Sequence, residues 1–315
     1  MTKLISTVAL TLFSLVSFCQ SPPARWTHVM CYDTDNKVVL MFGGSSSNGL
    51  YGDLWSFSKG QWKKLSDTGP APRGKHAFAY DEKRKVAVLF GGSGANDQLL
   101  GDTWEWNGKI WKEVKVPGPS MRDHPMAGFD PQSNTIIIRG GFSQQGLHTD
   151  SWSFDGIKWT ELKSAGSAGE GISHAMFTDL ARKRLMNITV EMNNQGQARI
   201  TNAFSSFENG KWQPAGKFPS TTPQSIQAIS SFGKGGIVML DGDDIENNIP
   251  MTVWSADGKW RSEHLKGPAP RVGHFMVWSP ADEAVILFGG FDRKNFFGDT
   301  WMWKNEKWSQ IPDAR

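Results

Sequence analysis

The stretch that decides the fold is HAFAYDEKRKVAVLFGGSGANDQLLGDTWEWNGKIWKEVKV, residues 76–116. It contains four short runs rich in Val, Phe, Trp and other strand-forming residues, and turn residues separate the runs. The third and fourth runs are joined by Asn107-Gly108. Asn-Gly is a strong hairpin signal because both central residues of the turn take positive φ. The stretch therefore predicts a meander of four antiparallel strands.

This pattern recurs along the chain at intervals of about 49 residues. Glycine pairs that follow an apolar run begin at Gly43, Gly91, Gly140 and Gly289. A tryptophan closes each repeat, at Trp62, Trp111, Trp159, Trp212, Trp260 and Trp308. A histidine keeps the same step in all repeats but the fifth, at His28, His76, His124, His174 and His274. The markers define six repeats, of which the fourth and fifth are degenerate.

A single meander of this kind cannot bury both of its faces, so successive repeats must pack on one another. A closed ring of blades covers both faces of every sheet. The sequence therefore predicts an all-β, six-bladed β-propeller of four-stranded antiparallel blades within residues 20–315. The expected blades cover about 24–65, 73–115, 122–163, 171–214, 224–265 and 271–311. Because the repeats begin with a first strand at about residue 25 and end with a fourth at about residue 311, we expect the first blade to be continuous in sequence.

The repeats resemble a known family. Each well-preserved repeat combines a histidine, a glycine pair, a variable loop, Gly-Asp-x-Trp and a closing tryptophan, as in GDTWEWNGKIW at 101–111. This combination resembles the kelch repeat, in particular that of bacterial exported kelch proteins. The resemblance covers the chain after residue 19 and implies a propeller of the kelch type. It does not define an activity, because function lies in sites grafted on a fold.

The first nineteen residues stand apart from the repeats. Lys3 is followed by the apolar run 4–18 and then by Cys19. One positive charge before an apolar run of this length is typical of a secretory signal peptide, whereas a membrane span needs about 20 apolar residues. We expect residues 1–19 to be a signal peptide and the protein to be periplasmic or secreted. Acylation of Cys19, which would anchor the protein to lipid, is the alternative.

Composition excludes several classes of function. The 34 Lys and Arg residues against 31 Asp and Glu leave no strong field for nucleic acid. Two cysteines supply neither a disulfide framework nor a four-ligand zinc site. The chain has no phosphate-binding loop, dinucleotide-binding fingerprint or hydrolase motif. A copper–tyrosyl oxidase is disfavoured because the only tyrosines are Tyr32, Tyr51 and Tyr80, with no spare cysteine to pair with one. We therefore expect no cofactor and no metal.

Most repeated residues are expected to be structural. Glycine pairs allow close backbone approach, and the tryptophans fill the space between blades. An aspartate opens the third strand of four repeats, at Asp53, Asp102, Asp150 and Asp299. The marker histidines lie in the first strands of successive blades, which spreads them around a ring, whereas a metal needs convergent ligands. We expect these histidines to be hydrogen-bonded structural residues.

Repeated arginines are the first candidate for a binding site. They stand two or three residues before the marker histidines, at Arg25, Arg73, Arg122 and Arg271. In kelch propellers the loops that carry them share one face with the loops after the glycine pairs. A half-ring of guanidinium groups on that face would suit carboxylate or carbohydrate ligands through forked hydrogen bonds. The alternative is that each arginine caps backbone carbonyls where its blade begins.

Loops that break the repeat are the second candidate. In the sixth repeat, FDRKNFF at 291–297 places aromatic and charged residues in one short loop. We expect ligand contacts from Arg73, Arg122, Arg271, Arg293, Asp292 and Phe296. In the fifth repeat, Asp241, Asp243, Asp244 and Glu246 could supply oxygen ligands to Ca²⁺, although their spacing is not that of an EF-hand loop.

These observations favour a monomeric module that binds a carbohydrate or protein ligand on its loop face. No catalytic motif is present, so an enzyme is the less favoured class. A sugar-active enzyme resembling a sialic-acid (N-acetylneuraminate) epimerase is the first alternative, since such enzymes are similar exported kelch propellers. A structural protein of the cell envelope is the second.

Overall fold

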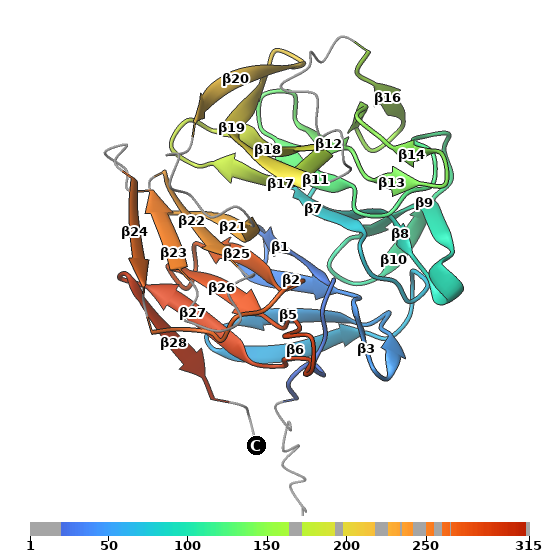
Figure 1. Cartoon of the computed structure of the whole chain (residues 1–315). Helices are drawn as coiled ribbons and strands as arrows, with labels where there is room; N and C mark the ends of the chain where they lie inside the picture. The colour runs from blue at the N-terminus through green and yellow to red at the C-terminus, as the bar shows by residue number, and fades with distance from the viewer. Residues whose placement is uncertain are drawn as a thin grey trace, which may run out of the picture.

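The computed structural model describes residues 20–163, 172–192, 198–217, 226–233, 235–241, 250–254, 260–264 and 266–312. Within these residues the strands form six four-stranded antiparallel sheets and two short two-stranded ribbons. The sheets follow one another around a common centre (Figure 1). The first strand of each sheet contacts the first strands of the two neighbouring sheets, and β25 contacts β1, so the ring is closed. The predicted all-β, six-bladed propeller is confirmed.

The strand bounds define each blade. The first three blades contain β1 (Val29–Asp33), β2 (Val38–Phe42), β5 (Leu54–Ser58) and β6 (Gln61–Ser66); β7 (Ala77–Asp81), β8 (Val86–Ser93), β9 (Leu99–Trp106) and β10 (Trp111–Val114); and β11 (Met126–Asp130), β12 (Thr135–Arg139), β15 (Ser151–Phe154) and β16 (Trp159–Glu161). The last three contain β17 (Ile172–Asp179), β18 (Arg184–Met192), β19 (Ala198–Glu208) and β20 (Lys211–Lys217); β21 (Ile226–Phe232), β22 (Gly236–Asp241), β23 (Pro250–Trp254) and β24 (Trp260–His264); and β25 (Phe275–Ser279), β26 (Ala284–Phe288), β27 (Thr300–Lys304) and β28 (Lys307–Ile311). The ribbons are β3 (Ser45–Ser46) with β4 (Gly49–Leu50), and β13 (Phe142–Ser143) with β14 (Gly146–Leu147).

The core lies between blades. The second strands are rich in buried apolar side chains, as in β26, where Val285, Ile286 and Leu287 are all 0% exposed. Side chains of β2 and β26 share one apolar cluster, and side chains of β2 and β8 share the next. Each sheet is therefore stabilised by its two neighbours, as the stacking of amphipathic repeats requires.

Ring closure follows the sequence-based expectation. Within the described part of the chain, the first blade is built from β1, β2, β5 and β6, and β28 pairs within the last blade, so no described C-terminal strand enters the first sheet. The seam is held by lateral contacts instead. The Trp62 indole N–H donates to the Thr300 hydroxyl across it at 2.8 Å. The Arg25 N–H donates to the Phe297 carbonyl at 3.0 Å.

The glycine pairs allow adjacent segments to meet backbone to backbone. Gly44 has φ +95°, and a Cβ there would lie 2.7 Å from the carbonyl oxygen of Trp26. A Cβ on Gly43 would overlap the carbonyl oxygen of Arg73 in the next blade. No L-residue with a side chain fits at Gly43 without displacing that backbone. No helix in the described part of the chain is long and apolar enough to cross a membrane.

Candidate functional site

The repeated arginines each form the same group of contacts with an aspartate and a tryptophan, which we call the Arg–Asp–Trp staple. Its members are Arg25, Asp53 and Trp55; Arg73, Asp102 and Trp104; Arg122, Asp150 and Trp152; and Arg271, Asp299 and Trp301. In the second blade Arg73 Nη1 donates to Asp102 Oδ1 at 2.6 Å and Nη2 to Oδ2 at 2.8 Å. The Trp104 indole N–H donates to the same Oδ2 at 2.7 Å. The staple thus ties the start of each blade to its third strand.

The same guanidinium groups also cap backbone carbonyls. Arg73 Nε donates to the Ala71 carbonyl at 2.9 Å, and Nη1 donates to the Gly91 carbonyl at 3.1 Å. Four of its five N–H groups are therefore used within the protein. The equivalent bonds recur for Arg25, Arg122 and Arg271. This result matches the carbonyl-capping alternative for these arginines.

The prediction that Arg73, Arg122 and Arg271 contact a ligand is corrected by their burial. The three residues are 0%, 1% and 1% exposed, so their guanidinium groups do not reach the surface. A buried cation is stable only where an anion and hydrogen-bond acceptors surround it, and the staple supplies both. The arginines are therefore structural.

The staple also sets the ionisation of its carboxylates. Burial alone would raise the pKa of the Asp102 carboxyl, but the hydrogen bonds and charge of Arg73 outweigh burial, and its pKa is lowered. The pKa values of Asp53 and Asp150 are lowered for the same reason. The pairs therefore stay ionised at neutral pH.

Three marker histidines lie in the interior beside the staples. His28, His76 and His274 are 2%, 2% and 4% exposed. Burial, followed by the charge of the neighbouring arginine, lowers the pKa of His76 and that of His274 to about 3. The His76 ring packs edge-on against Phe42 at 5.5 Å, and both its nitrogens lack a hydrogen-bond partner among the described residues. The burial of these histidines agrees with a structural role, but the hydrogen bonds expected for the marker histidines are not found at His76.

His124 does not belong to this set. The segments leading into the blades read Arg25-Trp-Thr-His28 and Arg73-Gly-Lys-His76, whereas the third reads Arg122-Asp-His124-Pro. Counted from the arginine, Pro125 occupies the position of the buried histidine, and His124 occupies the preceding one. Its side chain is 44% exposed. The marker assignment of His124 is therefore wrong by one residue, and the residue lies at the surface.

The position that His124 occupies is part of a continuous backbone feature, which we call the rim. The rim consists of Thr27, Lys75, His124 and Gly273, all with positive φ between 50° and 64°. The Thr27 N–H donates to the Gly273 carbonyl, the Lys75 N–H to the Thr27 carbonyl and the His124 N–H to the Lys75 carbonyl, at 2.8, 2.9 and 2.7 Å. These bonds connect the sixth, first, second and third blades in order.

The rim and the loops after the glycine pairs lie on one face, as expected. Each residue before the rim pairs with the residue after a glycine pair: Trp26 with Ser45, Gly74 with Ser93, Asp123 with Phe142, and Val272 with Phe291. We call this surface the loop face. The hairpins between third and fourth strands, such as 107–110, lie at the other end of the same strands, because each third strand begins at the loop face.

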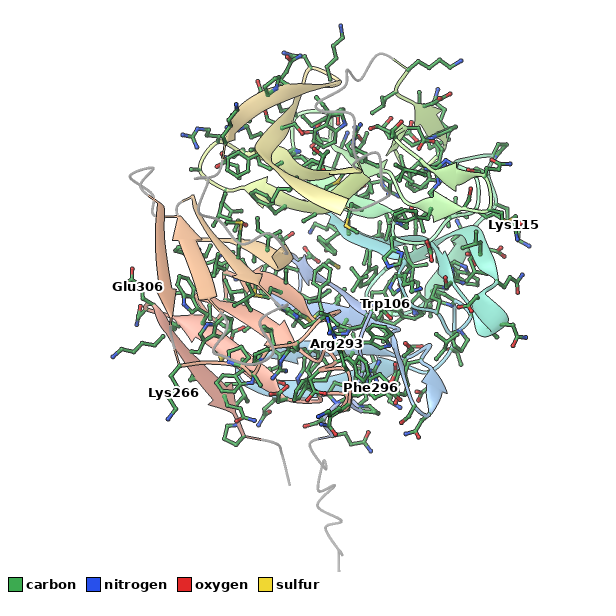
Figure 2. All side chains as sticks on the ribbon, viewed as in Figure 1. Trp106, Lys115, Lys266, Arg293, Phe296 and Glu306 are labelled. Carbon is green, nitrogen blue, oxygen red and sulfur yellow. The ribbon has the colours of Figure 1, made fainter. Side chains whose placement is uncertain are left out.

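One part of the loop face is aromatic. Phe291 and Phe296 stack with ring centroids 4.6 Å apart, and Trp26 of the first blade lies 5.4 Å from Phe291 and 6.4 Å from Phe296. All three side chains are partly exposed. Figure 2 shows Arg293 and Phe296 close together where the last blade meets the first. We call Trp26, Phe291 and Phe296 the aromatic cluster.

Asp292 shapes the turn that carries Arg293. Its Oδ1 accepts the backbone N–H groups of Lys294 and Asn295 at 2.8 and 2.6 Å, and these bonds lower the pKa of its carboxyl. Arg293 takes φ +72° and is exposed. Of the predicted contacts, Arg293 and Phe296 are thus available on the loop face, and the Asp292 carboxylate is used mainly to hold the loop.

A second part of the loop face is polar and was not predicted. Asp123 Oδ1 lies 3.2 Å from His124 Nδ1, and its Oδ2 lies 3.8 Å from Lys75 Nζ. The Ser93 hydroxyl donates to Oδ2 at 3.2 Å. Burial alone would raise the pKa of Asp123, but the hydrogen bond and charge of His124, with Lys75, lower it. The one-residue shift after Arg122 was the signal in the sequence that could have revealed this polar cluster.

No group of three or more potential metal ligands is found within the described residues. The proposed calcium ligands Asp243, Asp244 and Glu246, and the expected signal peptide at 1–19, lie outside those residues. Asp241 ends β22.

Comparisons with known proteins agree with this architecture. A family model described as the KLHDC2/KLHL20/DRC7 Kelch-repeats domain matches residues 5–189. This match covers more than half of the chain, so the chain belongs to the kelch-repeat family, as its repeats suggested. A solved structure titled "Structure of YjhT" superposes with a TM-score of 0.70 over 93% of this chain and 99% of that chain, at 15% identity. That similarity shows a shared fold.

A local sequence match is also found. Mei4-dependent protein 6 of Schizosaccharomyces pombe (strain 972 / ATCC 24843) is 42% identical over 43 residues. These residues make up 14% of this chain and 6% of that protein, so the match spans only a small part of that relative's length.

Proposed function

We propose that this kelch propeller is an exported module that binds a carbohydrate or protein ligand on its loop face. The observation that carries the proposal is the exposed Arg293 beside the partly exposed aromatic cluster. Aromatic rings bind the apolar faces of sugars and side chains, and an unpaired guanidinium offers forked hydrogen bonds. Concave or loop-bearing faces on rigid scaffolds are where binding residues gather.

The staples support this proposal because they provide rigidity. In four blades a buried arginine ties the segment before the first strand to an aspartate at the third strand through an ion pair. A binding surface on such a scaffold loses little conformational entropy when a ligand is bound. Export is supported by the composition of residues 1–19, and a mature chain beginning at Gln20 in the envelope or culture medium is the expected mass-spectrometric result.

The test of ligand binding is a glycan array and soluble sugar library, followed by capture of envelope proteins on the immobilised propeller. The variant Arg293→Ala/Phe296→Ala should lose the binding that wild type shows, with its thermal unfolding unchanged. The matched control is Lys109→Ala/Ile110→Ala, which removes one exposed cation and one exposed apolar side chain from a hairpin at the other end of the blade. Equal binding by wild type and both variants would contradict the assignment of the loop face.

A further inference from the structure

The polar cluster around Asp123 is distinct from the aromatic cluster, and its side chains indicate the chemical class of the ligand more specifically. We propose that Asp123, His124 and Lys75 form a binding site for the hydroxyl groups of a neutral sugar, with His124 Nε2 hydrogen-bonded to one of them and the buried Ser93 hydroxyl holding Asp123 in place. The proposal rests on the proposed function, since it places the sugar on the same loop face.

The backbone fixes His124 at the surface. Its N–H donates to the Lys75 carbonyl at 2.7 Å, and its φ of +50° belongs to a region that L-residues seldom adopt. Left-handed residues of this kind persist only where the surrounding structure holds them. Here the hydrogen bonds of the rim and the pairing of Asp123 with Phe142 hold it.

Two neighbours orient the imidazole. Nδ1 faces Asp123 Oδ1 at 3.2 Å, and the Phe142 ring meets the imidazole edge-on with centroids 6.0 Å apart. Nδ1 is therefore directed toward an acceptor within the protein, and the other ring nitrogen, Nε2, can hydrogen-bond to a ligand. Because the side chain is 44% exposed, Nε2 is available for a hydrogen bond to a ligand on the loop face.

The other members supply complementary groups. The Lys75 side chain is 32% exposed and can donate, and the Asp123 side chain is 15% exposed and retains acceptor capacity beyond its present partners. The Thr27 hydroxyl lies 3.5 Å from that of Ser45 on the neighbouring part of the rim. Closely spaced donors and acceptors of this kind match the adjacent hydroxyls of a sugar ring, each of which both donates and accepts.

Charge decides between neutral and acidic ligands at this cluster. Asp123 lies between Lys75 and His124, and its charge opposes the approach of a carboxylate or phosphate. An exposed cation that could bind an acidic group is found instead at Arg293, beside the aromatic cluster. The polar cluster therefore fits neutral sugars better than acidic sugars.

The experiment measures binding of neutral mono- and disaccharides, and of the corresponding uronic acids, by isothermal titration and by chemical-shift changes of the His124 imidazole at neutral pH. We expect neutral sugars to bind and to shift the His124 signals. We expect His124→Ala and Asp123→Asn to weaken binding about tenfold or more, with unchanged thermal unfolding. His124→Gln, which keeps a side-chain hydrogen-bonding group, should restore part of the affinity.

The matched control is His148→Ala, because His148 lies on the same face of the third blade and its Nε2 lies within hydrogen-bond distance of the nearby Ser143 hydroxyl, at 2.8 Å. It should bind like wild type. Binding that is lost in Arg293→Ala/Phe296→Ala but unchanged in His124→Ala would overturn this inference and leave the proposed function standing. Binding of the uronic acids alone would also overturn this inference, and so would binding of no free sugar. If no free sugar binds, capture of envelope proteins on the immobilised propeller tests whether the ligand of the proposed function is a protein.

Discussion

The first, second, third and sixth blades carry the Arg–Asp–Trp staple, and the fourth and fifth do not. Counted back from the closing tryptophan, the aspartate position is held by Ala203 in the fourth blade and by Met251 in the fifth. The preceding stretches 164–171 and 218–225 contain no arginine. Both blades nevertheless form four-stranded antiparallel sheets. The staple is therefore not what pairs the strands.

Strand pairing has a different source, which all six blades share. Ile188 of β18 and Val238 of β22 are 0% exposed, like their counterparts in the stapled blades. Burial of the second strand stabilises each sheet, and the staple adds a fixed position for the segment that leads into the blade. The repeat therefore contains two sets of residues with different roles. Its apolar residues build the blades, and its charged residues fix the segments that form the loop face.

The largest expected effect comes from breaking one staple. Arg73→Ala leaves the Asp102 carboxylate without its buried partner, and such a loss costs about 3–5 kcal/mol of unfolding free energy. Lys211→Ala, which removes an exposed cation from the unstapled fourth blade, should change stability by less than about 0.5 kcal/mol. Denaturant unfolding measures both, and equal losses would mean that the staple is no stronger than a surface charge.

The buried histidines beside the staples predict acid sensitivity. Because the pKa of His76 is about 3 in the fold and about 6.5 in an unfolded chain, the unfolded state binds more protons between these values. Stability is therefore complete above pH ~6.5 and falls as the pH drops toward about 3. In His76→Gln the slope of unfolding free energy against pH should fall by about one proton, or 1.4 kcal/mol per pH unit. An unchanged slope would show that His76 is protonated in the native protein.

The lowered pKa of the staple carboxylates adds a second acidic phase. A depressed folded-state pKa stabilises the protein above the unfolded value near 4, and this contribution is lost as the pH falls below it. This phase should persist in His76→Gln, which separates the two effects in the same titration.

A smaller effect concerns the tryptophans that link neighbouring blades. The Trp159 indole N–H donates to the Thr103 hydroxyl of the preceding blade at 3.0 Å, and Trp212 donates to Ser151 in the same way, also at 3.0 Å. The first blade has Leu54 at this position, and the buried Trp111 N–H has no hydrogen-bond partner among the residues that the structure describes. Thr103→Val should cost about 1–3 kcal/mol, because it creates the same unpaired N–H.

Thr103→Ser keeps the hydroxyl and serves as the control. Its unfolding free energy should lie closer to that of wild type than Thr103→Val does. If the two variants were equally stable, the hydrogen bond between blades would contribute nothing measurable, and apolar packing alone would join the blades.

The blades could be predicted from the sequence because strand composition, turn residues and the closing tryptophans recur at one period. The role of the arginines could not be read from one repeat, since an arginine near a turn is usually exposed. The constant separation of 28 or 29 residues between each arginine and its aspartate was the available signal for a buried pair. His124 was misassigned because periodic counting tolerates a shift of one residue, whereas backbone geometry does not.

The smallest expected effect on stability is that of the loop face itself. Arg293 is exposed, so Arg293→Ala should alter the unfolding free energy by less than about 0.5 kcal/mol while weakening ligand binding. Thermal unfolding of Arg293→Ala and Arg73→Ala, measured side by side, compares an arginine of the binding surface with an arginine of the staple. A similar loss of stability in both variants would contradict the division between structural arginines and a ligand-binding arginine.

The most direct test of that division is the reactivity of each arginine in the native protein. Phenylglyoxal modifies accessible guanidinium groups, and peptide mass spectrometry identifies the modified residues. The account predicts rapid modification of Arg293 and protection of Arg25, Arg73, Arg122 and Arg271 until the protein is unfolded. If the four repeated arginines were modified as fast as Arg293, the account would be contradicted, and these arginines would again be candidates for ligand contacts.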